Sequence, residues 1–107
     1  MKLSTILLTP LSLAAVSSAW KLELFASDGR KMTASGRDPN SGCKNIAFTP
    51  VLNVNRAKFN KDTSLLPDPK TFELFVNKNC DGLSYRNGNG NHKLTPARKI
   101  RSYRVKN

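Results

Sequence analysis

Residues 20–25 read WKLELF, a stretch in which apolar and charged side chains alternate with a period of two. This period is typical of a β-strand that buries one face. The tetrapeptide LELF at 22–25 recurs fifty positions later as FELF at 72–75, again with a glutamate between apolar residues. The sequence therefore predicts two similar strands, one near the start of each half of the protein.

A second set of matches extends this repeat at an offset of forty-six positions. A longer loop in the first half accounts for the difference of four residues between the two offsets. We interpret the matches as an internal duplication, with halves at 20–60 and 70–107 and a linker at 61–69. Two prolines in the linker exclude it from a central strand, because proline donates no backbone hydrogen bond. The four identical pairs are Gly42 and Gly88, Asn45 and Asn91, Thr49 and Thr95, and Pro50 and Pro96.

Further strands are predicted at 54–59 and 100–105, where apolar and basic residues are mixed. Between the strands lie Asp28-Gly29, Asp81-Gly82 and the Asn-Gly pairs within 87–90, which favour tight hairpin turns. No segment shows helical periodicity over more than about two turns. We predict an all-β protein, a compact β-sandwich in a single domain. Its expected core comprises Trp20, Leu22, Leu24, Phe48, Val54, Phe72, Leu74, Ile100 and Val105.

The chain has 107 residues, with 18 Lys and Arg against 7 Asp and Glu, and a formal net charge of +11. This length excludes a nucleotide-binding domain joined to a separate substrate domain. Residues 1–19 are typical of a secretory signal peptide, because Lys2 precedes an uncharged apolar run and small residues precede Trp20. The run is shorter than the ~20 residues of a membrane-spanning helix. We therefore expect a secreted, extracellular mature chain at 20–107 without a transmembrane segment.

Cys43 and Cys80 are the only cysteines in the chain. In an oxidising compartment we expect them to form one disulfide, which would contribute roughly 3 to 4 kcal/mol by restricting the unfolded chain. Two free thiols or an intermolecular bridge are the alternatives.

The order of elements in each half resembles a Greek-key motif of the βγ-crystallins: a strand ending in Leu-Phe, a turn, a middle containing glycine, and a closing strand such as 100–105. Two such motifs make one domain, so the resemblance implies a β-sandwich of two Greek-key motifs over 20–107. The pattern is also similar to small secreted fungal proteins. A second resemblance is to fungal effectors built as a β-sandwich with one disulfide, but those are not duplicated, and Cys43 lies well past the first strand.

Calcium binding is a frequent property of βγ-crystallin domains, through acidic, amide and hydroxyl side chains just before the closing strand. Aligned on Ser102, this chain has Ala97 and Arg98 at the acidic positions and Arg101 at the hydroxyl position. The first half offers only amides at 53 and 55. Because calcium requires several oxygen ligands around one point, we expect no metal site, and no cofactor of any other kind.

Catalysis has one candidate, the single histidine His92, which we expect in a turn-rich loop. Together with Glu73 and Arg98 it would form the acid, base and phosphate-binding groups of a small secreted nuclease-like hydrolase. The simpler interpretation is that His92 is a solvated loop residue and that Glu23 and Glu73 are outward strand positions, available to pair with Lys or Arg. We therefore predict that the protein is not an enzyme, with the hydrolase as the alternative.

Positive charge is concentrated at 82–107, which carries seven basic side chains and no acidic one, whereas 20–81 has a net charge of only +3. We expect part of it to form a patch that binds an anionic surface such as a cell wall or membrane head groups, or a host protein. Nucleic acid is a weaker candidate because only two tyrosines accompany the charges. The alternative is a face that merely keeps the protein soluble. The seven residues are Arg86, Lys93, Arg98, Lys99, Arg101, Arg104 and Lys106.

Taken with the secretion signal, this charge predicts a monomeric, non-enzymatic effector or antimicrobial toxin that acts outside the cell. A structural protein associated with the cell wall is a further alternative.

Overall fold

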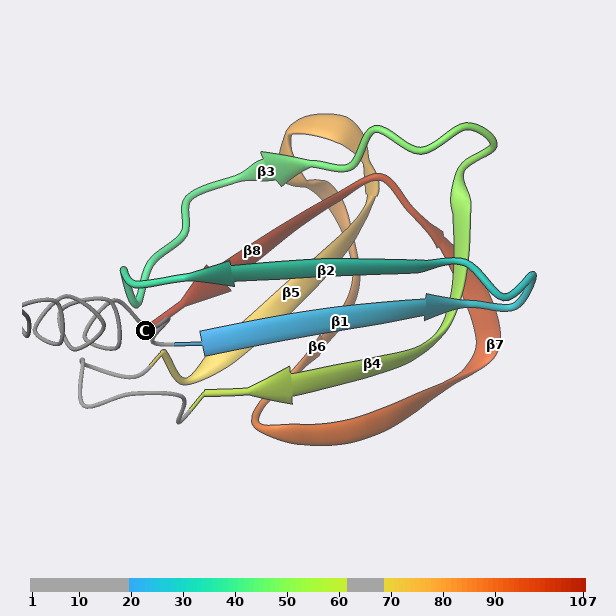
Figure 1. Cartoon of the computed structure of the whole chain (residues 1–107). Coiled ribbons are helices and arrows are strands. Elements are labelled where there is room, and N and C mark those ends of the chain that lie inside the picture. The colour runs from blue at the N-terminus through green and yellow to red at the C-terminus, as the bar shows by residue number, and fades with distance from the viewer. Residues whose placement is uncertain (1–19, 62–68) are drawn as a thin grey trace, which may run out of the picture.

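The computed structural model describes residues 20–61 and 69–107, so the predicted signal peptide at 1–19 and most of the predicted linker lie outside it. The described residues form an all-β protein, as predicted, with one short 3-10 segment (Figure 1). In chain order the elements are β1 (Trp20–Ala26), β2 (Lys31–Gly36), β3 (Lys44–Asn45), β4 (Leu52–Asn60), β5 (Thr71–Asn77), η2 (Lys78–Cys80), β6 (Asp81–Asn87), β7 (Gly90–Ile100) and β8 (Ser102–Lys106).

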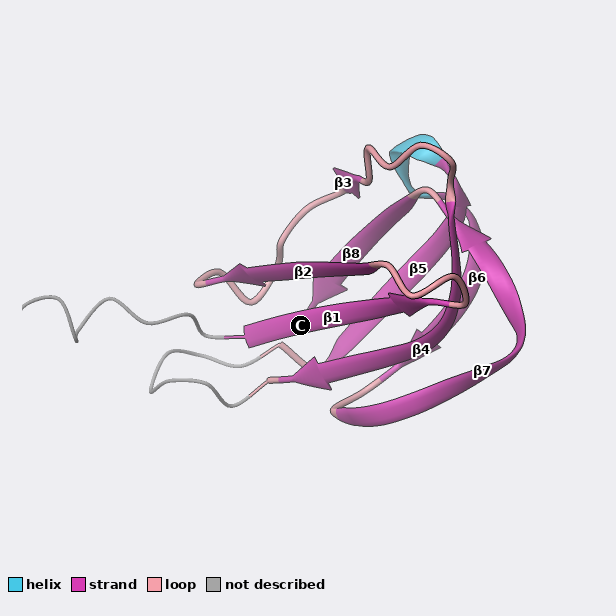
Figure 2. Cartoon of the chain, turned by 45° about the vertical axis from the view of Figure 1, so that its right-hand side comes forward, coloured by secondary structure: helices cyan, strands magenta, loops and turns pink. Residues whose placement is uncertain are grey.

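The strands form two sheets, which lie one behind the other in Figure 2. Sheet A has the order β2-β1-β4-β7 and sheet B the order β3-β8-β5-β6, with antiparallel pairing throughout the described ladders. Each sheet contains one strand from the other half of the chain, since β7 completes sheet A and β3 completes sheet B. The two sheets have corresponding strand orders. Strands β2, β1, β4 and β7 of sheet A correspond to β6, β5, β8 and β3, which is the order of sheet B read from its other edge.

The alternation of β1 is realised in the structure, because Leu22 and Leu24 are fully buried between the sheets while Lys21 is exposed. Burying one such side chain contributes about 1.5–3 kcal/mol. All the predicted core residues are buried except Phe48, which packs partly buried against the core. The prediction missed several core residues: Ala26, Ile46, Leu52, Ala57, Phe59, Leu94 and Tyr103.

Strand register is the same in the two halves at the two repeat offsets. Leu22 of β1 lies opposite Phe59 of β4, and fifty and forty-six positions later Phe72 of β5 lies opposite Val105 of β8. The glutamates follow this rule, since Glu23 faces a lysine and Glu73 faces an arginine at the corresponding places.

One predicted turn is wrong. Asp81-Gly82 opens β6, and the chain reverses before it in η2, where Asn79 and Cys80 have φ angles of 62° and 54°. The left-handed conformation is unusual for residues other than glycine, and tertiary contacts hold it here. Asn79 donates its backbone N–H to the side-chain oxygen of Asn45 at 2.8 Å, and the Asn45 amide donates to Asn79 at 3.2 Å.

The predicted closing strand at 100–105 is also wrong, because two strands of different sheets meet within it. Ile100 ends β7 in sheet A, Ser102 begins β8 in sheet B, and Arg101 lies between them. Arg101 donates its N–H to Phe75 and accepts a hydrogen bond from Ile46, both at 2.9 Å. The alternation of faces expected for one strand is lost, since Ser102 and its neighbour at 103 are both buried.

The predicted disulfide is confirmed. Cys43 and Cys80 are bonded, with their Cα atoms 5.9 Å apart, and the described residues hold no free cysteine. The bond ties the segment before β3 to η2. No helix among residues 20–61 and 69–107 is long and apolar enough to span a membrane.

Gly36, at the end of β2, is in contact with the ring of Trp20. A Cβ at this position would lie 2.7 Å from Cζ2 of that ring. We expect Gly36→Ala to lower the free energy of unfolding by about 1–2 kcal/mol, because the tryptophan must move out of its packed position. Urea denaturation measures this. Gly88→Ala is the control, since its Cβ would lie 3.4 Å from the nearest atom, and equal losses in the two variants would contradict the prediction.

Candidate functional site: the outer face of sheet A

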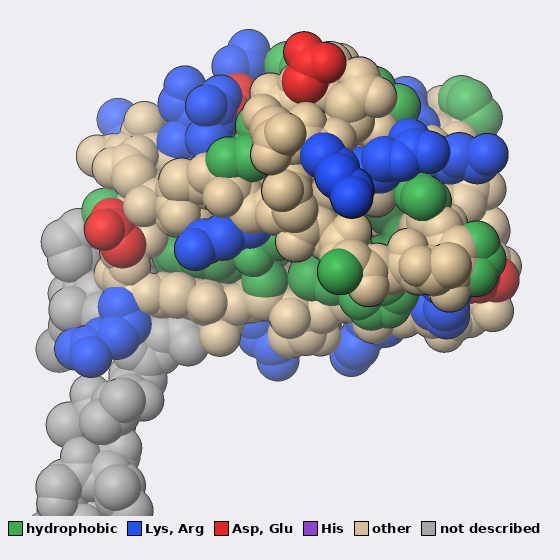
Figure 3. All heavy atoms as spheres, turned by 90° about the horizontal axis from the view of Figure 1, so that it is seen from above, with side chains coloured by type: hydrophobic (Ala, Val, Ile, Leu, Met, Phe, Trp, Pro, Cys, Tyr) green, Lys and Arg blue, Asp and Glu red, His purple; other side chains and the backbone are tan. Residues whose placement is uncertain are grey.

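The predicted basic residues do not gather at one place. Lys93 and Lys99 lie on β7 in sheet A, whereas Arg86, Arg104 and Lys106 lie on β6 and β8 in sheet B. In the view of Figure 3, basic side chains are spread over the face and acidic ones are few.

Two of these arginines are paired with one carboxylate. Arg104 approaches Glu73 at 2.7 Å and Arg86 approaches it at 3.3 Å, and the Arg104 guanidinium also lies over the ring of Phe75. Glu73 faces outward from sheet B and is paired with arginines, as expected, but its side chain is only 4% exposed. Glu73 therefore forms ion pairs with two basic residues of the predicted patch, Arg86 and Arg104.

The side chains of Arg98 and Arg101 also make contacts within the protein. The Arg98 guanidinium lies over the ring of Tyr85, and its Nη1 is buried without a hydrogen-bond partner among the described residues. Arg101 donates from Nη1 to the carbonyl of Val76 at 2.9 Å. Neither side chain extends freely into solvent.

His92 lies in β7 and not in a loop, contrary to the sequence prediction. It is half-buried, its Nε2 is 2.9 Å from the carbonyl oxygen of Gly88, and its ring packs near Phe72 and Tyr85. Because successive side chains of a strand point to opposite faces, Glu73 lies on the other side of sheet B from Phe72. The structure therefore does not bring His92 and Glu73 together.

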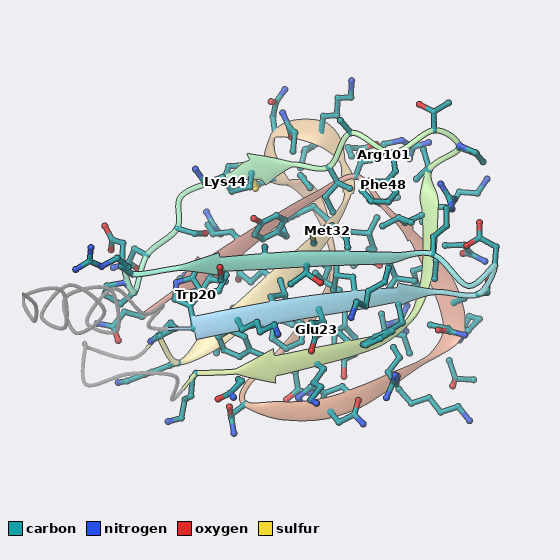
Figure 4. The ribbon with its side chains drawn as sticks, viewed as in Figure 1. Trp20, Glu23, Met32, Lys44, Phe48 and Arg101 are labelled. Carbon is teal, nitrogen blue, oxygen red and sulfur yellow. A yellow bond between two sulfur atoms is a disulfide. The ribbon has the colours of Figure 1, made fainter. Side chains whose placement is uncertain are left out.

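A different basic surface lies on the outer face of sheet A, and we call it the cationic face. Its outward side chains come from β1, β2, β4 and β7, and Figure 4 shows Glu23 near its middle. Glu23 is the one carboxylate of this face in the described structure. The cations are Lys21, Lys31, Arg56, Lys58 and Lys93.

Glu23 is held ionised by its neighbours. Lys31 donates a hydrogen bond to it at 3.1 Å, and this bond lowers the pKa of Glu23 against the opposing effect of desolvation. The charges of Lys31, Lys21 and Lys58 lower that pKa further. One carboxylate thus interacts with three lysines, so the face keeps a strong net positive charge.

Phe25 provides an apolar support for two cations of the face. The Arg56 guanidinium lies 4.0 Å from the ring centroid and the Lys31 ammonium 5.6 Å from it. Such contacts between a cation and an aromatic ring contribute about 0.5–1 kcal/mol at exposed sites. This contact holds the Arg56 guanidinium over the Phe25 ring without neutralising its charge.

Beside Arg56 the face is hollowed. The β4–β7 ladder is interrupted here: Val54 faces Arg98 and Arg56 faces Lys93, so that residues 94–97 of β7 oppose Asn55 alone. The hollow has a volume of about 390 Å³. It is lined by Asn55, Arg56, Asn91 and Lys93.

Arg56 and Lys93 are directly opposite each other and carry the same charge. Like charges in this position destabilise a sheet, and neither side chain has an ion-pair partner in the part of the chain that the structure describes. An anion placed between them would relieve the repulsion, and the two asparagine amides could donate hydrogen bonds to it.

Sequence reasoning missed this face because its residues are scattered over four strands. The only available signal was the alternation within each strand, such as the basic residues at 56 and 58, and strand order cannot be read from that pattern. No group of three or more His, Cys, Asp and Glu within 20–61 and 69–107 could hold a metal ion. No protein-family model matches this chain, and no curated protein or solved structure matches it.

Proposed function

We propose that this is a non-enzymatic binding protein that attaches to an anionic surface through the cationic face of sheet A. The observation that carries the proposal is the pair of Arg56 and Lys93, which has no acidic partner among residues 20–61 and 69–107 and lies beside a hollow lined with amides. Solubility alone requires no such pair, because exposed charges can be spread out to avoid repulsion.

The kind of surface follows from the chemistry of the face. Phosphate and carboxylate groups accept hydrogen bonds from guanidinium, ammonium and amide donors together. Nucleic acid fits less well, because single strands bind through exposed aromatic rings, and the Phe25 ring already has two cations packed near it. Phosphate head groups or an acidic cell-wall polymer are therefore the proposed partners.

Secretion and an effector or antimicrobial role complete the proposal. They are supported by the apolar leader at 1–19 and by the disulfide, which persists in oxidising compartments. A toxin that disturbs membranes and an effector that coats a cell wall would both use this face.

We also propose that the two halves are duplicated Greek-key motifs related to those of the βγ-crystallins. Three observations support this: the corresponding strand orders of the two sheets, the exchange of β3 and β7 between halves, and the equal registers at the two offsets. The identical residues at the same offsets are consistent with it.

The test is binding of the purified protein to vesicles containing phosphatidylglycerol, to polygalacturonate and to RNA, each at low and high salt. We expect binding to at least one of the first two, weakening as salt rises because exposed charges are then screened. Arg56→Glu with Lys93→Glu should weaken it roughly thirty-fold or more, since each cation near an anionic membrane contributes about 1 kcal/mol.

The control is Lys70→Glu with Lys78→Glu, which changes the net charge equally at exposed positions outside the cationic face. Equal losses in the two double variants, with both folded by circular dichroism, would show that net charge alone governs binding. Binding to RNA only would reject the proposed partners.

A further inference from the structure

A second hollow lies at the end of the sandwich where β1 begins and β2 ends, and we call it the terminal pocket. It encloses about 220 Å³, roughly the room of seven liquid waters. Trp20 and Lys44, both labelled in Figure 4, belong to its wall. The complete lining is Trp20, Ser35, Gly36, Arg37, Asp38, Asn40, Ser41, Lys44 and Tyr103.

The loop that forms one wall of the terminal pocket is held in place by its own polar groups. Asp38 Oδ1 accepts the N–H of Asn40 at 2.9 Å, and Asn40 Oδ1 accepts the N–H of Asn107 at 2.9 Å. The Ser41 hydroxyl accepts the N–H of Val105 at 2.8 Å. These bonds fix the pocket before any ligand arrives, which lowers the entropy cost of binding.

The same residues keep polar groups that make no hydrogen bond within the described chain. Asp38 has a second carboxylate oxygen as an acceptor, and Asn40 has its amide as a donor. Lys44 and the Tyr103 hydroxyl add to this set. Burial raises the pKa of Tyr103, so its hydroxyl stays protonated and can donate.

The rest of the wall is aromatic and rigid. The Trp20 side chain is packed against Gly36, and its indole N–H donates to the carbonyl of Asp38 at 2.8 Å. Trp20 and Tyr103 are only 3% and 9% exposed, so the pocket has a buried aromatic floor under a polar rim. This combination is common in small-molecule sites.

We propose that the terminal pocket binds a single neutral sugar ring. A hydroxyl group both donates and accepts, so a polyhydroxyl ligand can satisfy the carboxylate, the amide and the ammonium of the rim at once. The rim combines one carboxylate, Asp38, with two cations, Arg37 and Lys44, so neither a simple anion nor a simple cation can interact favourably with all of these groups. The site is separate from the cationic face, which has no such balance of charges, and it does not depend on the proposed function.

The experiment uses Trp20, the only tryptophan in the chain, as the reporter. Its fluorescence and its indole N–H resonance are followed while glucose, mannose, galactose or N-acetylglucosamine is added to the purified protein. We expect a saturable change with at least one sugar and none with inorganic phosphate or glycine. No response to any sugar, or a response to phosphate, would overturn the proposal.

Two variants localise the binding. Asp38→Asn and Tyr103→Phe each remove one hydrogen-bonding function and keep the size of the side chain, and each should weaken sugar binding roughly ten-fold. Asp81→Asn makes the same charge change outside the pocket and should bind as the unmodified protein does. If binding persists unchanged in both pocket variants, or is lost equally in Asp81→Asn, the terminal pocket is not the site.

Discussion

Replacing both Cys43 and Cys80 with serine is expected to lower the free energy of unfolding by roughly 3 to 4 kcal/mol. The reason is that the unfolded chain gains conformational entropy when the cross-link is absent. The bond closes a loop with a sequence separation of 37 residues. It also holds β3, a strand of two residues, next to η2. For a small domain whose total stability is about 5–15 kcal/mol, this is a large share. Urea denaturation of the two proteins measures it.

Reduction of the unmodified protein provides the control, because it opens the same loop without changing any side chain other than the two cysteines. It should shift the unfolding midpoint as the double serine variant does. Mass analysis of the purified protein should show no thiol that can be alkylated before reduction. Two alkylated thiols, or an unchanged midpoint in the variant, would contradict the prediction.

Glu73→Ala is the second substitution with a large expected effect, a loss of about 2–3 kcal/mol in the free energy of unfolding. Removing one partner of a buried ion pair costs about 3–5 kcal/mol, and the loss is smaller here because Arg86 and Arg104 are 54% and 40% exposed. The variant leaves these two guanidinium groups facing each other across β5 without the carboxylate between them. Thermal and urea denaturation measure the loss.

Glu23→Ala is the matched control, because Glu23 occupies in β1 the place that Glu73 occupies in β5. In the described structure Glu23 has one ion pair, with Lys31, where Glu73 has two, and its side chain is 13% exposed where that of Glu73 is 4% exposed; ion pairs near the surface contribute less than about 1 kcal/mol. Glu23→Ala should therefore change stability little, while increasing binding to anionic vesicles because the cationic face loses its carboxylate. Equal destabilisation by the two substitutions would reject this account.

The contrast between the two glutamates also explains why we place binding on sheet A. On sheet B, Glu73 neutralises arginines from both neighbouring strands. On sheet A, Glu23 pairs with a lysine from β2, and the described residues provide no acidic partner for Arg56 and Lys93, which lie opposite each other on β4 and β7. The two halves thus share a register but differ in how their outward charges are balanced.

Local pattern determined much of the fold. The alternation at 20–25 and 72–75 is a property of adjacent residues, so strands and their buried faces were predictable there, and two cysteines in a small chain predicted their own pairing. The same reasoning failed at 100–105, where the chain passes from sheet A to sheet B. The pattern of apolar and basic residues does not reveal this crossing, because it depends on hydrogen bonds between Arg101 and backbone groups that are distant in sequence.

The candidate sites show the same division. The sequence by itself determined that this protein is basic, all-β and closed by one disulfide, since charge, periodicity and cysteine count do not depend on which strands are neighbours. Only the tertiary structure decided which basic side chains are paired with an acidic group. Arg86 and Arg104 are neutralised because β5 lies between their strands, whereas Arg56 and Lys93 face each other because β4 pairs with β7. Electrostatic interaction depends on distance in space, and strand order, which sets that distance, arises from long-range packing.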